Sequence, residues 1–134
     1  MGMEFYGNSY KGNDEPIFVG IPTFLKLPWI RSHEELKSVR PDVAIIGEPF
    51  DFGTTIRPGA RYGPRAIRAA STVPSPPYEH FNIETGVDPF GVFRTVDYGD
   101  VNISPGDVVE SHRRMTDKVK EVLDLDGIPV MLGG

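Results

Sequence analysis

The sequence contains no cysteine among its 134 residues. This absence excludes disulfide bonds, thiolate metal sites and thiol nucleophiles for the stretch, and it is typical of proteins of the reducing cytosol. No apolar run approaches the roughly 20 residues that span a membrane, and the first residues lack the basic and apolar regions of a secretory signal. We therefore expect a cytoplasmic protein without a membrane partner.

Basic charge is in short supply, since 14 Lys and Arg face 19 Asp and Glu and the net charge is −5. An acidic balance argues against nucleic acid or an anionic membrane surface as a partner. Nucleotide-binding loops are missing as well, because neither Gly-x-x-x-x-Gly-Lys-Ser/Thr nor a strand followed by Gly-x-Gly-x-x-Gly occurs. The sequence therefore predicts no nucleic-acid partner.

Clustered metal ligands are also missing. His33, His80 and His112 each stand alone, and none lies at helix-neighbour spacing from another histidine. Surface positions are the simplest interpretation of His80 and His112. No Ser/His/Asp arrangement stands out either. We therefore expect no catalytic residue and no metal ligand in this chain.

Glycine and proline are abundant, with 15 and 13 residues, which predicts several loops of fixed shape. Residues 1–41 are irregular, and Pro22 and Pro28 exclude a central strand or a long helix there. We expect an apolar arm that packs on the body of the protein or on a neighbouring subunit. A short helix over 32–39, capped by Ser32, would follow it.

Regular patterns occupy residues 42–134. Apolar runs bounded by Gly or Pro predict strands at 43–47, 92–98 and 128–132. Helices are expected at 63–71, with Pro64 in its first turn, and at 107–126, with Ser104 as the cap and an apolar stripe that includes Val122. Alternation of strand and helix is typical of a parallel sheet, so we predict the first β-α-β-α-β portion of an incomplete α/β domain. The excursion over 72–91 remains undeciphered.

The loop between the first strand and the first of these helices combines hydroxyl and guanidinium groups. Thr54, Thr55, Arg57 and Arg61 precede a helix start whose free N–H groups could attract an anion or a carboxylate. The alternative, which we favour, is that Arg57, Arg61, Arg65 and Arg68 are ion-paired residues of a surface or an interface.

Asp97 and Asp100 flank Gly99 at the end of the second predicted strand, where a carboxylate pair could face a ligand. An Asx-type turn, in which Asp100 accepts backbone hydrogen bonds, is the interpretation that we favour.

Four segments carry a family resemblance, in matching order and spacing: IPTFLKLP (21–28), DVAIIGEPFDFGTTIRPGARYGPRAIR (42–68), VDYGDV (96–101) and PVMLGG (129–134). Together they resemble the N-terminal part of ureohydrolases, the arginase/agmatinase family, in its agmatinase-like branch. The resemblance covers about residues 17 to 134.

The resemblance implies a three-layer α/β/α fold with a parallel sheet of which about three strands are present here. It also implies two Mn²⁺ ions per active site in the full-length enzyme, hydrolysis of a guanidino compound to urea and an amine, and a homo-oligomer. Gly133 and Gly134 match the lead-in to the Asp-His ligand motif of the family, and none of the ligands maps onto this chain. Thr54, Thr55, Arg57, Gly59 and Arg61 would carry over as the rim of the substrate pocket.

We therefore interpret the chain as the N-terminal segment of an agmatinase-like amidinohydrolase. We expect this segment to be inactive on its own. Two alternatives stay open: a non-catalytic interaction or assembly module that uses the apolar arm and a sheet edge, and an anion-binding module that uses the arginine loop.

Overall fold

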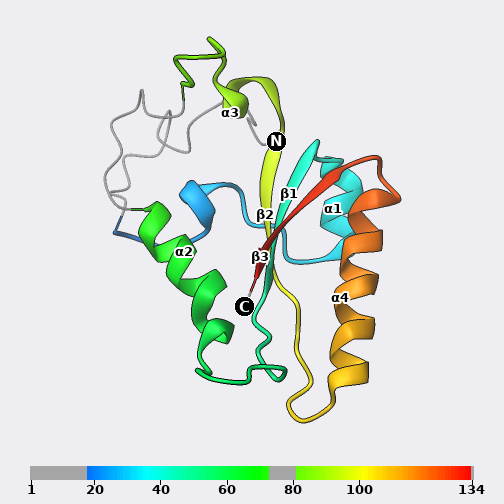
Figure 1. Ribbon diagram of the computed structural model, residues 1–134. Helices are drawn as coiled ribbons and strands as arrows, with labels where there is room; N and C mark the ends of the chain where they lie inside the picture. The colour runs from blue at the N-terminus through cyan, green and yellow to red at the C-terminus, as the bar shows by residue number, and fades with distance from the viewer. Residues whose placement is uncertain (1–17, 73–80, 134) are drawn as a thin grey trace.

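The computed structural model describes residues 18–72 and 81–133. Its centre is a parallel sheet of three strands, β1 (Val43–Glu48), β2 (Thr95–Asp100) and β3 (Ile128–Gly133), in the order β2-β1-β3. Helix α2 (Gly63–Ser71) lies on one face of the sheet, and α1 (His33–Val39) and α4 (Val108–Leu123) lie on the other (Figure 1). The three-layer α/β/α fold with a parallel sheet is confirmed.

The central position of β1 follows from its sequence. Its residues from Ala44 to Gly47 are buried, as expected for an apolar strand covered by helices on both faces. Val43 pairs with Thr95 of β2 on one side and with Ile128 of β3 on the other. The main core lies between β1, β2 and the helices α1 and α4, and Leu36 and Val122 from these helices are fully buried in it.

The second strand was predicted too early in the chain. The prediction began at Val92, whereas β2 begins at Thr95 and Pro89–Val92 form the short helix α3. The side chain of Asp88 accepts a hydrogen bond from Phe90 N at 3.0 Å, and Pro89 occupies the first turn. This cap favours a helical turn over the extended backbone that the apolar run at 92–93 suggested.

Helices α1 and α2 lie where the sequence predicts them. Ser32 caps α1 by accepting from Glu35 N at 3.2 Å, and Arg40 ends the helix with a left-handed φ of 46°. Helix α2 begins with Gly63 and Pro64 and follows the short 3-10 helix η2 (Ala60–Tyr62).

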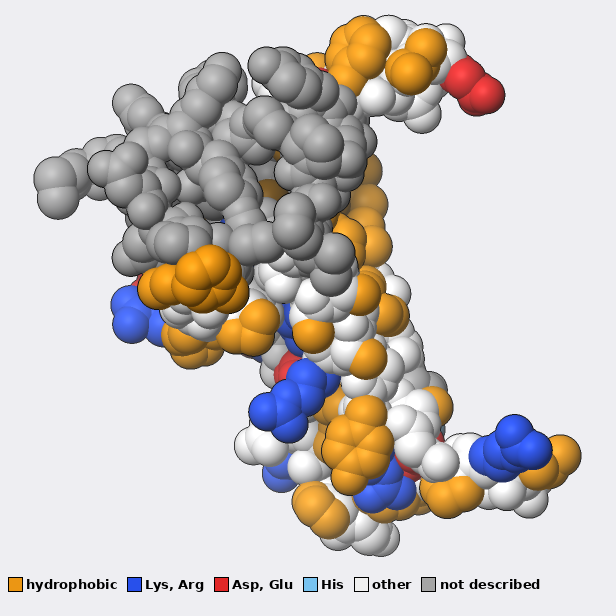
Figure 2. Space-filling view, turned by 90° about the vertical axis from the view of Figure 1, so that its left-hand side faces the viewer, with side chains coloured by type: hydrophobic (Ala, Val, Ile, Leu, Met, Phe, Trp, Pro, Cys, Tyr) orange, Lys and Arg blue, Asp and Glu red, His pale blue; other side chains and the backbone are white. Residues whose placement is uncertain are grey.

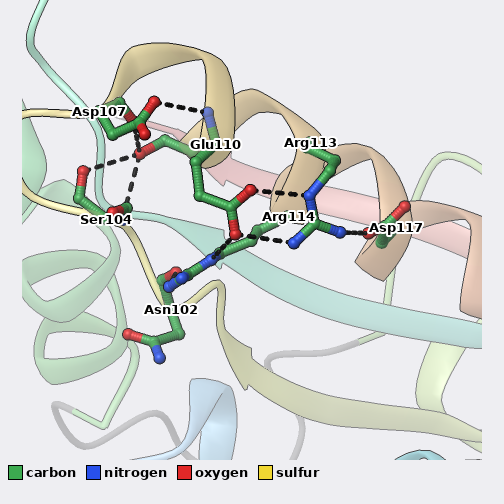
Figure 3. Close-up of polar contacts among 8 residues, drawn as sticks. Asn102, Ser104, Asp107, Glu110, Arg113, Arg114 and Asp117 are labelled. Carbon is green, nitrogen blue, oxygen red and sulfur yellow. Dashed lines mark hydrogen bonds and ion pairs between the residues drawn. The ribbon is translucent and has the colours of Figure 1, made fainter.

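Helix α4 has a different cap from the predicted one. Asp107, not Ser104, caps it by accepting from Glu110 N at 2.9 Å. Ser104 belongs instead to a turn in which its carbonyl accepts from Asp107 N at 3.1 Å. Glu110 forms an ion pair with Arg114 at 2.7 Å, and Figure 3 shows Glu110 between the guanidinium groups of Arg114 and Arg113.

The N-terminal arm packs on the body of the protein, as predicted. After the short helix η1 (Phe24–Lys26), Ile30 N donates to Asp97 O at 2.9 Å and Asp97 N donates to Pro28 O at 3.0 Å. The arm thereby covers the outer edge of β2, and Ile30 is buried in the core. The arm residues before Phe18 lie outside the described part.

Strand β3 forms the other edge of the sheet, and no described strand pairs with its outer side. Ile128 and Val130 keep 59% and 40% of their surface exposed. Figure 2 views the molecule from the side of α2, where hydrophobic and basic side chains both reach the surface. Of the predicted excursion over 72–91, residues 73–80 lie outside the described part, and Asn82 and Val87 form an antiparallel bridge. None of the described helices is long and apolar enough to cross a membrane.

Candidate functional site

The carboxyl ends of β1, β2 and β3 meet at one edge of the sheet, because the strands are parallel. Ligands of open α/β sheets bind at this edge, beyond the strand ends. Two described loops leave it, one over 49–59 after β1 and one over 101–107 after β2. The residues that shape these loops form the candidate site.

Asp51 fixes the shape of the loop after β1. Its side chain is 1% exposed and accepts from Gly59 N at 2.7 Å and from Arg61 Nε at 2.6 Å. Gly59 has a φ of 129°, a left-handed conformation that favours glycine. Hydrogen bonds from the Arg61 guanidinium lower the pKa of Asp51 to about 2. The loop is therefore closed by a charged clasp between Asp51 and Arg61.

The residues predicted for the pocket rim lie in or beside this clasp. Gly59 and Arg61 belong to it, whereas Thr54, Thr55 and Arg57 are exposed at the turn of the loop. Arg57 forms no ion pair with any residue in 18–72 or 81–133. The ion-paired interpretation holds for Arg61 and not, within the described chain, for Arg57. That these five residues line a pocket stays a prediction.

Arg68 joins α2 to the end of β2. This residue is 7% exposed, and its guanidinium donates from Nε to Asp97 Oδ2 at 2.8 Å and from Nη2 to Asp97 Oδ1 at 3.0 Å. Its Nη1 donates to Asp100 Oδ1 at 2.5 Å. Burial alone would lower the pKa of Arg68, but these hydrogen bonds raise it above its ordinary value. Arg68 is thus ion-paired, as predicted, but inside the protein and not on its surface.

The Asx-type turn at the end of β2 is present, but it uses the other aspartate. Asp97 Oδ1 accepts from Gly99 N at 2.8 Å, whereas Asp100 binds Arg68. Gly47 on β1 makes room for this contact, since a Cβ there would lie 1.8 Å from Asp100 Oδ1. Both carboxylates therefore face an internal guanidinium.

Glu48, Phe50 and His112 lie on the opposite side of the same edge. The ring centroids of Phe50 and His112 are 5.1 Å apart. Burial raises the pKa of Glu48, and the nearby His112 lowers it by a smaller amount. His112 is exposed, in agreement with the predicted surface position. His33 lies on α1 with its Nδ1 3.8 Å from Glu121, and His80 is outside the described residues.

The described residues do not fit the manganese centre that the resemblance implies. No group of three or more His, Asp or Glu able to hold a metal ion occurs in 18–72 or 81–133. Asp97 and Asp100, the two aspartates at the carboxyl end of β2, are bound by Arg68. Gly133 ends β3 at this edge, and Gly134 is outside the described part.

Comparison with known proteins decides the family. The profile of the arginase family matches residues 41–134, which include all three strands. The chain belongs to the arginase family. It is 38% identical to guanidinobutyrase of Pseudomonas aeruginosa, over 92% of this chain and 37% of that enzyme, and 37% identical to mitochondrial agmatinase of Gallus gallus, over 87% and 32%.

Solved structures of this family agree in fold. Proclavaminate amidino hydrolase from Streptomyces clavuligerus superposes with a TM-score of 0.74 at 33% identity, over 90% of this chain and 37% of that one. A hypothetical agmatinase from Burkholderia thailandensis gives a TM-score of 0.71 at 30% identity. The arginase-family chain described here therefore spans about a third of the length of its relatives.

Sequence reasoning missed the three carboxylate partners of the arginines, which are Asp51 for Arg61 and Asp97 with Asp100 for Arg68. A usable signal exists for Asp97, because it interrupts a buried apolar strand, where an ionised side chain requires a partner. For Asp51 no comparable signal exists, since loops tolerate exposed carboxylates.

Proposed function

We propose that this chain forms the N-terminal α/β part of an agmatinase-like amidinohydrolase, which hydrolyses a guanidino compound to urea and an amine. The observation that carries the proposal is the 38% identity to a guanidinobutyrase across almost the whole chain. The relatives named agmatinase, guanidinopropionase and proclavaminate amidinohydrolase support a guanidino substrate. The enzyme is cytoplasmic and homo-oligomeric in this proposal.

In this proposal two Mn²⁺ ions of the full-length enzyme would supply the Lewis-acid chemistry of the hydrolysis. The described residues contain no ligand group for them, so this part of the enzyme contributes the framework at the carboxyl edge. Asp51 with Arg61 shapes the first loop, and Arg68 with Asp97 and Asp100 fixes the second strand end. Thr54, Thr55 and Arg57 are proposed to face the substrate pocket from the turn of the first loop.

A chimera tests the proposal directly. The matching segment of the Pseudomonas guanidinobutyrase is replaced by residues 18–134 of this chain, and urea release is measured with Mn²⁺ and a panel of guanidino compounds. We expect urea from at least one compound, because the chain is similar in sequence and fold to enzymes of this family. A folded chimera of the parent's oligomeric size that binds Mn²⁺ and releases no urea would count against the proposal.

The isolated chain provides the complementary measurement. We expect the purified 134-residue chain to release no urea from agmatine or guanidinobutyrate and to bind Mn²⁺ no more tightly than a control protein, since a manganese site needs several clustered ligands. Urea release above a metal-only control would contradict this expectation.

The alternative function, an interaction or assembly module, is favoured by one observation, the open outer side of β3 with Ile128 and Val130 exposed. The chimera also distinguishes this reading, because a module would support assembly without urea release.

A further inference from the structure

The geometry points to Arg68 as a positioning residue that holds the N-terminal arm and the end of β2 in place by filling a guanidinium-binding site built from Asp97 and Asp100. This inference concerns the chain itself and holds whether or not the chain is part of an amidinohydrolase. Its test therefore needs no measurement of urea, and its failure is distinguishable from failure of the proposed function.

The site has the geometry of guanidinium recognition. Asp97 presents both carboxylate oxygens to Arg68, at 2.8 and 3.0 Å, which is the bidentate arrangement that a planar guanidinium fork favours over a lysine ammonium. Asp100 takes a third N–H at 2.5 Å. Gly47 has no side chain and so leaves the space in which the Asp100 carboxylate meets the Arg68 guanidinium.

The same carboxylate also holds the arm. Phe24 N donates to Asp97 Oδ2 at 2.7 Å, and this oxygen is the one that accepts from Arg68 Nε. The backbone of Asp97 meanwhile pairs with Pro28 and Ile30. Asp97 is 1% exposed, so without Arg68 it would be a buried charge whose remaining donors are backbone N–H groups. A buried carboxylate without a charged partner is unfavourable, so we expect Asp97 to move toward water in the absence of Arg68. This movement breaks the hydrogen bond from Phe24 N.

A second contact connects Arg68 to the arm through the backbone. Ser71 Oγ donates to Arg68 O at 2.7 Å and accepts from Leu25 N at 2.8 Å. Two consecutive residues of the arm are therefore held, Phe24 by the carboxylate that Arg68 binds and Leu25 by Ser71 of α2. Loss of the guanidinium alone leaves the serine contact in place, so we expect the arm to loosen at Phe24 first.

The experiment removes the guanidinium and returns it in solution. Arg68→Ala is compared with Arg65→Ala, a matched control on the same helix that is exposed and has no ion pair within the described chain. Trp29, the single tryptophan, reports the arm by fluorescence, because it lies beside Gly99 of β2. Hydrogen exchange at Phe24 N–H is compared with exchange at Ile46 N–H in β1, and far-UV circular dichroism follows the fold.

For Arg68→Ala we expect a shift of Trp29 emission to longer wavelength at temperatures where circular dichroism is still native. Exchange at Phe24 should become about tenfold faster or more, as expected for loss of a charge-assisted hydrogen bond, with little change at Ile46. Millimolar guanidinium chloride should reverse both effects, whereas the same concentration of sodium chloride should not. Arg65→Ala should behave like the unsubstituted chain.

Two results would overturn the inference. One is a folded Arg68→Ala chain with unchanged Trp29 emission and Phe24 exchange. The other is a folded Arg68→Ala chain in which exchange rises equally at Phe24 and Ile46 and does not respond to guanidinium, which describes general destabilisation. Where Arg68→Ala does not fold, Arg68→Lys decides, because an ammonium keeps the charge but cannot bind both carboxylates as the fork does. Exchange at Phe24 should still rise in Arg68→Lys, and unchanged exchange would reject the positioning role.

Discussion

Single residues at the carboxyl edge act in guanidinium–carboxylate pairs. Arg61 closes the loop after β1 through Asp51, and Arg68 binds the end of β2 through Asp97 and Asp100. The carboxylates of Asp51 and Asp97 are almost fully buried, so each pair is shielded from solvent on the acidic side. Removal of one partner from a buried pair is far more disruptive than removal of an exposed charge.

The clasp predicts unequal effects of two neighbouring arginines. Arg61→Ala should lower the Tm of the chain and increase proteolytic cleavage within 52–58, because Asp51 loses its charged partner. Arg57→Ala, the matched control, should change the Tm little, since Arg57 is exposed and unpaired within the described residues. Equal Tm losses in thermal unfolding would show that the clasp does not hold the loop.

The pH dependence of stability follows from Asp51. Its folded pKa of about 2 lies below its ordinary 3.8, so the contribution of the clasp is fully present above about pH 4 and is lost as the pH falls through about 2. Glu110 acts in the same direction, because hydrogen bonds from Arg113 and Arg114 lower its pKa to about 2 from 4.5.

Thermal unfolding between pH 2 and pH 5 tests this dependence. Asp51→Asn and Glu110→Gln should each flatten the fall of Tm below pH 4, and the double substitution should flatten it further. A pH profile identical to that of the unsubstituted chain in both variants would be inconsistent with the two depressed pKa values.

At the scale of elements, α4 shows how a helix start is chosen between two candidate caps. Asp107 caps Glu110 N, while Ser111 Oγ donates to Asp107 O at 2.7 Å and accepts from Ser104 N at 3.1 Å (Figure 3 shows Ser104, Asp107 and Glu110). The serine hydroxyl thereby fixes the turn that precedes the helix.

The two candidate caps give a direct comparison. Asp107→Ala should destabilise the chain by about 1 kcal/mol, the usual contribution of an N-cap. Ser104→Ala should have a clearly smaller effect, because only backbone atoms of Ser104 take part in the turn. Chemical denaturation measures the free energy of unfolding of both variants. A larger loss of stability in Ser104→Ala would show that Ser104, the residue predicted from the sequence, is the cap.

Elements with local signals were predictable and tertiary contacts were not. Pro41 precedes β1, Gly47 is its second-last residue, and Gly63 with Pro64 starts α2, so these elements follow from local residues. The start of β2 was misjudged because the two-residue apolar run at 92–93 cannot distinguish a strand from a capped turn. Arg68 and Asp97 are 29 residues apart, so their pairing requires the crossover geometry that only the fold supplies.

At the scale of the whole molecule, the two edges of the sheet differ. The arm covers the outer edge of β2 and brings Pro28 to it, whereas β3 presents an apolar, uncharged edge with no described neighbour. Natural sheets protect their edges with charges, prolines or covering segments. The chain therefore has a protected side and a side suited to association.

We predict that the isolated chain forms dimers or larger species through β3. Val130→Lys should shift the population toward monomers, because a charge on an edge strand opposes pairing. Val109→Lys is the control, since Val109 is an exposed hydrophobic residue on α4. Light scattering over a concentration series measures both. Unchanged association in Val130→Lys, or equal dissociation in the two variants, would contradict a role of β3.

Pro129 limits where another strand can join β3. Ile128 N donates inward to Asp42 O at 2.9 Å, and N–H groups alternate in direction along a strand, so Pro129 occupies an outward position. Proline carries no N–H, which leaves Met131 as the first outward donor. An incoming strand thus finds outward N–H donors only in the half of β3 nearest the carboxyl edge, whereas the Pro129 carbonyl remains an outward acceptor. A single imino acid therefore confines the outward donors of β3 to the end of the sheet where Glu48 and Asp100 lie.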